Sequence, residues 1–73
     1  MDLDTINRHV AALDTAAELL DLLATDLDHE ARTETDETTA LELRIASERA
    51  QQGWAHATGA ARALRDLRPR IVA

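Results

Sequence analysis

The side chains most capable of catalysis or metal binding are those of three histidines and one serine, His9, His29, His56 and Ser47. His29 has Asp26 three residues before it and Glu30 directly after it. A di-metal helical bundle needs inward-facing Glu-x-x-His pairs on two helices, and the sequence contains none. Ser47 has no His and acid at a spacing typical of nucleophilic catalysis. We therefore expect no metal, no cofactor and no catalytic residue.

Four arginines lie close together near the end of the sequence, Arg62, Arg65, Arg68 and Arg70. Guanidinium groups bind phosphate well, so this cluster is a candidate contact for phosphate or nucleic acid. Cations are also favoured at the C-terminal end of a helix, where they offset the negative end of its dipole. No aromatic residues lie among the arginines, and no helix-turn-helix spacing is present, so nucleic acid is the weaker interpretation.

The apolar residues of the first half recur at intervals of three and four, which is typical of the seam of a coiled coil and cannot be a strand. They are Leu3, Ile6, Val10, Leu13, Ala17, Leu20, Ala24, Leu27 and Ala31. Asp2 or Asp4 is placed to cap the start of such a helix. The pattern predicts a helix over about 3–32.

The second half repeats this spacing and predicts a helix over about 37–67. Its seam is expected to contain Ala40, Leu43, Ala46, Ala50, Trp54, Ala57, Ala61 and Leu64. Pro69 disfavours helical geometry at Arg68, so the helix is expected to end there. Residues 1–68 are then a helical hairpin domain and residues 69–73 a short C-terminal tail.

Residues 33–39 contain no apolar side chain and are rich in helix-capping types, which predicts a turn followed by a second helix. Two amphipathic helices joined by a short turn pack antiparallel, and the numbers of facing residues then sum to about 70. Leu20 meets Ala50 and Leu13 meets Ala57, so large side chains face small ones. The fold class is an all-α antiparallel two-helix hairpin. One continuous helix is the alternative, because the turn contains no Gly or Pro.

Two glycines and the only aromatic residue lie within the second predicted helix. Gly53 and Gly59 each lower helix stability by about 1 kcal/mol relative to Ala, which indicates close approach of a neighbour. Trp54 is expected in the seam, facing Ala16 and Ala17. At the edge of the seam it would instead be an anchor for a partner.

A second apolar set lies outside the predicted seam. Leu19, Leu22 and Leu23 stand on the opposite side of the first helix from Leu13 and Leu20. One hairpin cannot cover such a set, and an exposed apolar surface of this kind marks an interaction site. The residues expected to form the interface are Leu19, Leu22, Leu23, Leu41, Ile45 and Trp54. Two hairpins packed through it would form a four-helix bundle with two-fold symmetry.

Charge divides unevenly between the two halves. Residues 1–37 hold 11 acidic residues and 2 arginines, a net charge of -9, while residues 38–73 hold 3 and 6, a net charge of +3. This difference favours antiparallel pairing of the halves, within a chain or between chains. Each exposed pair contributes at most about 1 kcal/mol, so charge selects the register more than it stabilises it.

Length and composition set the broad class. A chain of 73 residues forms at most one domain with a marginal core, and the absence of Cys excludes disulfides and Cys-based zinc sites. No stretch is apolar enough for a membrane span or a secretory segment, so we expect a soluble cytoplasmic protein. All eight cations are Arg and Ala is the commonest residue, which suggests a GC-rich bacterial genome.

The sequence therefore predicts a small non-enzymatic protein–protein interaction module that forms a homodimer. A two-helix chain has no cleft that surrounds a substrate, which argues against an enzyme. One alternative is a heteromeric adaptor or small regulatory subunit that binds a partner helix. A second alternative is a nucleic-acid-associated regulator that uses the arginine cluster.

Overall fold

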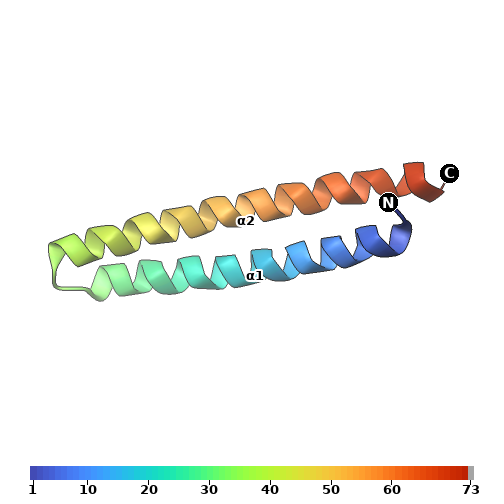
Figure 1. Ribbon diagram of the computed structural model, residues 1–73. Coiled ribbons are helices and arrows are strands. Elements are labelled where there is room, and N and C mark those ends of the chain that lie inside the picture. The colour runs from blue at the N-terminus through green and yellow to red at the C-terminus, as the bar shows by residue number, and fades with distance from the viewer. Residues whose placement is uncertain (73) are drawn as a thin grey trace.

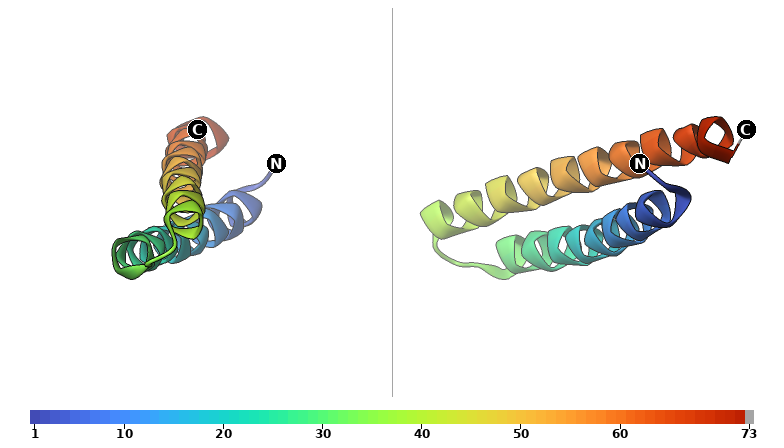
Figure 2. Two further views of the ribbon diagram at one scale, coloured as in Figure 1. Left: turned by 90° about the vertical axis from the view of Figure 1, so that its left-hand side faces the viewer. Right: turned by 45° about the vertical axis from the view of Figure 1, so that its right-hand side comes forward.

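The computed structural model describes residues 1–72, which form two long helices, α1 (Leu3–Thr33) and α2 (Glu37–Val72). The helices lie side by side, with the turn at one end and both termini at the other (Figure 1). Figure 2 shows that their axes are inclined to each other rather than strictly parallel. The rod measures 57 × 13 × 13 Å. The all-α hairpin is confirmed, and the continuous helix is excluded.

An aspartate begins each helix. The Oδ1 of Asp2 accepts a hydrogen bond from the backbone N–H of Thr5 at 2.7 Å. The Oδ2 of Asp36 accepts from the backbone N–H of Thr39 at 2.9 Å and from its hydroxyl at 2.7 Å. These bonds satisfy amides that the first turn of a helix leaves free. The sequence left open whether Asp2 or Asp4 caps α1, and the structure shows Asp2 in that role.

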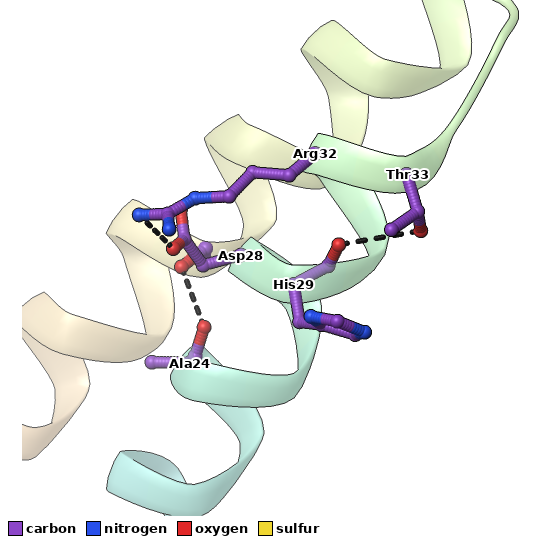
Figure 3. Close-up of polar contacts among 6 residues, drawn as sticks. Ala24, Asp28, His29, Arg32 and Thr33 are labelled. Atoms are coloured by element: carbon purple, nitrogen blue, oxygen red, sulfur yellow. Dashed lines mark hydrogen bonds and ion pairs between the residues drawn. The ribbon is translucent and has the colours of Figure 1, made fainter.

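The turn between the helices consists of residues 34–36. The Glu34 carboxylate accepts a hydrogen bond from the backbone N–H of Asp36 at 3.0 Å, which folds the turn on itself. The Thr33 hydroxyl donates to the carbonyl of His29 at 3.3 Å, at the last turn of α1 (Figure 3). Local polar contacts therefore reverse the chain without Gly or Pro.

Helix α2 continues through Pro69 to Val72, so the predicted end near residue 67 is wrong. The expected tail over 69–73 is helical as far as residue 72, and Ala73 lies outside the described residues. Proline lacks an N–H, so it removes the bond to the carbonyl of Arg65, four residues earlier. In the last turn this loss is confined to one bond, because the residues after Pro69 keep their own amides.

Alanine fills most of the contact between the helices. The buried apolar residues are Ile6, Val10, Ala17, Ala24, Ala31, Ala40, Ala50, Ala57 and Ala61. In α1, Val10 and the three buried alanines recur every seven residues, as the predicted seam requires. Small side chains allow the axes to approach toward the lower end of the usual range of about 8–10 Å. The leucines of the predicted seam are consequently only half-buried.

One buried polar side chain crosses the seam. Ser47 is 2% exposed, and its hydroxyl donates to the carbonyl of Ala24 at 2.8 Å. Figure 3 includes this bond at the Ala24 carbonyl. The two residue numbers agree with the predicted register, whose facing numbers sum to about 70. Ser47 takes the buried position that the spacing predicted for Ala46, which is half-buried.

Trp54 is not in the buried seam, because 44% of it is exposed. Next to it, Gly53 lies against Leu20 of α1: a Cβ atom at residue 53 would be 3.2 Å from the Leu20 Cδ1. Helices this close leave no room for an indole ring between them, so Trp54 lies at the edge. The predicted close neighbour is confirmed for Gly53 but wrong for Gly59, whose Cβ position has nothing within 4 Å.

Candidate interaction surface

The exposed large apolar side chains are the main feature of the surface. All six residues predicted to form an interface are exposed, with between 43% and 63% of each accessible to solvent: Leu19, Leu22, Leu23, Leu41, Ile45 and Trp54. Leu67 and Ile71 near the end of α2 are exposed as well. Because the core consists mainly of alanine, much of the large apolar surface of this chain faces solvent.

These residues do not share one face. Leu22 precedes the buried Ala24 by two residues, and Ile45 precedes Ser47 by two residues, a rotation of about 200° in each case. Since Ala24 and Ser47 face each other across the seam, Leu22 and Ile45 point outward in opposite directions. Leu41 lies about 100° around α2 from the buried Ala40 and also faces outward.

Two long sides of the hairpin run parallel to the seam, and one of them is polar. On that side an Nη atom of Arg65 contacts the carboxylate of Asp14 at 2.5 Å, and both side chains are nearly half exposed. Residues seven apart return to nearly the same side of a helix. We call this side the polar flank; it consists of Asn7, Asp14, Asp21 and Asp28 of α1 and Arg44, Gln51, Thr58 and Arg65 of α2.

The other side is apolar along most of the rod. Leu20 lies on this side of Ala17, three residues after it, whereas Asp14 lies three residues before it on the polar side. Leu20 lies against Gly53, so Gly53 is on this same side of the hairpin in α2. We call this side the apolar flank; it consists of Leu13, Ala16, Leu20, Leu23 and Leu27 of α1 and Leu43, Ala46, Gly53, Ala60, Leu64 and Leu67 of α2.

Two predicted interface residues border these flanks. Leu19 follows Ala16 by three residues, which places it at the outer edge of the apolar flank. Trp54 follows Gly53 by one residue, a rotation of about 100° that carries it across the seam toward the polar flank. The apolar flank therefore includes Leu23, is bordered by Leu19, and excludes Trp54. The expectation that Leu23 stands on the opposite side of α1 from Leu13 and Leu20 is wrong, because three residues separate Leu20 from Leu23 and leave them on one side of the helix.

Charge also distinguishes the two helices. Between Leu3 and Thr33, α1 carries seven acidic residues and two arginines; between Glu37 and Val72, α2 carries four acidic residues and six arginines. The ion pair of Asp14 with Arg65 joins the two helices. The long Arg side chain reaches this carboxylate from further along α2. A second pair, Arg32 with Asp28 at 2.8 Å, lies within α1 (Figure 3).

The four clustered arginines do not form one basic patch. Arg65 is paired with Asp14, and Arg68 is half-buried with its Nε enclosed and without a hydrogen-bond partner within residues 1–72. Arg62 and Arg70 are exposed. Together the four span about 200° of the circumference of α2. The cluster thus contributes partly to the contact between the helices rather than to a single phosphate-binding face.

The histidines lie apart from one another on exposed positions of the two helices. Within the described part of the chain, no three His, Asp or Glu side chains come together as metal ligands would. The hydroxyl of Ser47 donates its hydrogen bond to the Ala24 carbonyl in the seam.

The two capping aspartates have lowered pKa values. The backbone N–H of Thr5, and then its hydroxyl, lower the pKa of Asp2 below 3.8. Hydrogen bonds from the hydroxyl and the backbone N–H of Thr39 do the same to the pKa of Asp36. Because each carboxylate accepts these bonds at the start of a helix, the shifts reflect helix capping.

The sequence identified the exposed leucines but not the side of the hairpin on which each one lies. A pattern that separates the two sides was present, since Asp14, Asp21 and Asp28 recur every seven residues and so mark one side of α1 as polar. Neither α1 nor α2, over residues 1–72, is apolar over enough of its length to cross a bilayer. Comparisons with protein families, curated proteins and solved structures found no match to this chain.

Proposed function

We propose that this protein is a non-enzymatic interaction module that self-associates, with two hairpins forming a four-helix bundle. One observation carries the proposal: the buried side chains of the core are mainly alanines, whereas several of the larger leucine side chains are exposed to solvent. Leu19 is 62% exposed and Leu23 is 47% exposed, although both are side chains that folding normally covers. A second hairpin would cover Leu23 and the edge on which Leu19 lies.

The energetics of a short chain support association. Fully burying a Leu side chain contributes about 1.5–3 kcal/mol, and an alanine, with its much smaller apolar surface, contributes less. A chain of 73 residues has a marginal core even with large buried side chains. Two hairpins packed through the apolar flank would cover Leu23 and bury the half-buried leucines of that flank more deeply, which a single hairpin cannot do.

The shape of the rod supports a role in binding rather than catalysis. Two helices side by side give a cross-section of 13 × 13 Å, which has no depth for surrounding a substrate. What this shape offers a partner is a long face, and helix packing along such a face is the usual way in which bundles assemble.

Light scattering after size exclusion, over a wide range of protein concentration, tests the proposal. We expect a particle of twice the 8.0 kDa mass of one chain. The double variant Leu19→Glu/Leu23→Glu should shift the particle to one chain, because the charged side chains would have to be desolvated in the interface. Circular dichroism of the same samples shows whether the variant remains helical.

The matched control is Ala11→Glu/Thr15→Glu, which adds the same charge at the same four-residue spacing on exposed positions of α1 away from the apolar flank. It should leave the dimer intact. A wild-type chain that stays a single particle at every concentration would contradict the proposal. If that particle were also partly unfolded, binding to a helix of another protein would become the better interpretation.

A further inference from the structure

We infer that the second copy packs on the apolar flank with its turn at the same end of the bundle, so that α1 of each hairpin lies against α2 of the other. This inference rests on the proposed homodimer and adds the face and the orientation. It is carried by the chemistry of the two flanks, by the opposite charges of the two helices and by the distribution of large and small side chains.

The two flanks differ in how many charged side chains a second copy would have to desolvate when it packs on them. Packing on the polar flank would enclose Asp14, Asp21 and Asp28, and buried carboxylates need paired or hydrogen-bonded partners. The apolar flank has no ionisable side chain between Leu13 and Leu27 on the α1 side or between Leu43 and Leu67 on the α2 side. It is therefore the side that a second copy covers without desolvating charge.

Two-fold symmetry leaves two ways of pairing one flank with itself. An axis along the rod keeps both turns at one end and places α1 against the partner's α2. An axis across the rod puts the turns at opposite ends and places α1 against the other α1. The seven acidic residues of α1 disfavour the second arrangement, whereas the six arginines of α2 favour the first.

Side-chain size favours the same arrangement. The α1 side of the apolar flank carries mainly leucines, whereas the α2 side has small residues along its middle, Ala46, Gly53 and Ala60. With the turns together, each row of leucines meets a row of small side chains, and the helices interdigitate evenly. With the turns apart, leucines meet leucines on one side of the bundle and small residues meet on the other, which spaces the helices unevenly.

The orientation is tested with a spin label in the turn. The chain contains no Cys, so Thr35→Cys, at an exposed turn position, provides a single attachment site. Pulsed electron paramagnetic resonance then measures the distance between the two labels of a dimer. Turns at one end should give a separation of one to two helix diameters, roughly 10–25 Å. Turns at opposite ends should give a distance close to the 57 Å length of the rod.

The face is tested with two neighbouring leucines. Leu23→Glu alters the apolar flank, whereas Leu22→Glu makes the same change one residue away on the outer side of α1. We expect Leu23→Glu to raise the dimer dissociation constant at least about a hundredfold, because every dimer buries two copies of this residue. Leu22→Glu should change it by less than about threefold, the range usual for exposed substitutions.

The outcomes separate this inference from the proposed function. A dimer with a long label separation, or one that Leu22→Glu disrupts as strongly as Leu23→Glu, overturns the inferred face or orientation and leaves self-association standing. A wild-type chain that remains a single particle overturns both. The label measurement uses an otherwise unchanged chain, so it decides the orientation even if Leu23→Glu fails to fold.

Discussion

At the scale of single residues, the seam depends on side chains small enough for two helices to touch. Ser47 is one of them, and its hydroxyl reaches the Ala24 carbonyl because no larger group separates the helices. Gly53 is another, since Leu20 fills the space that a side chain there would need. Sequence spacing predicted a seam but misplaced Trp54 in it, because spacing specifies direction and not the distance between the axes.

The two glycines of α2 should respond differently to replacement by alanine. Gly59→Ala should raise the free energy of unfolding by about 1 kcal/mol, because a methyl group there meets nothing and alanine favours the helix. Gly53→Ala should gain less, because its Cβ would lie 3.2 Å from Leu20, which must shift. Urea denaturation of both variants measures the difference, and an equal gain at the two sites would contradict the contact.

At the scale of elements, both helix starts and the end of α1 followed from the sequence, because caps and polar turns are local signals. Asp2 accepts the hydrogen bond that its position indicates, and Asp36 is one of the capping residue types in the polar stretch over residues 33–39. The end of α2 did not follow, because Pro69 was taken to stop the helix. Proline removes its own amide bond and crowds the carbonyl four residues earlier, but so near the end of α2 these effects did not stop the helix. The polar and apolar flanks were not predicted, because each flank combines one side of α1 with one side of α2 and so depends on how the two helices pack.

Capping should make the start of α2 sensitive to acid. The pKa of Asp36 is lowered in the folded chain, so its stabilising contribution is complete above the ordinary value of 3.8 and is lost as the pH falls through the lowered pKa. Asp36→Asn keeps a capping side chain but does not titrate. The difference in unfolding free energy between wild type and Asp36→Asn should therefore change below about pH 4 and stay constant above pH 5–6, where the carboxylate is ionised.

Urea denaturation at a series of pH values provides this comparison, with Asp4→Asn as the control. Asp4 is exposed in the first turn of α1 and accepts no capping hydrogen bond in the structure. A constant difference for Asp36→Asn down to the lowest pH would mean that Asp36 does not cap α2 in solution.

At the scale of the whole molecule, stability and assembly should be linked. A chain whose apolar flank is covered only in a dimer unfolds from that dimer, and mass action then makes the midpoint of thermal unfolding rise with protein concentration. Thermal scans followed by circular dichroism over a wide concentration range measure this dependence. Leu23→Glu should remove it, whereas Leu22→Glu should retain it. A midpoint independent of concentration in the wild type would indicate that the hairpin is stable alone.

Trp54 gives the molecule an optical property that follows from its place at the edge of the seam. It is the only aromatic residue, so all of the intrinsic fluorescence of the protein comes from one indole ring. The residue is 44% exposed beside the contact between the helices, where separation of the hairpin would bring more water to its ring. The wavelength of its emission therefore reports the closure of the hairpin without any attached dye, and no second fluorophore complicates the signal.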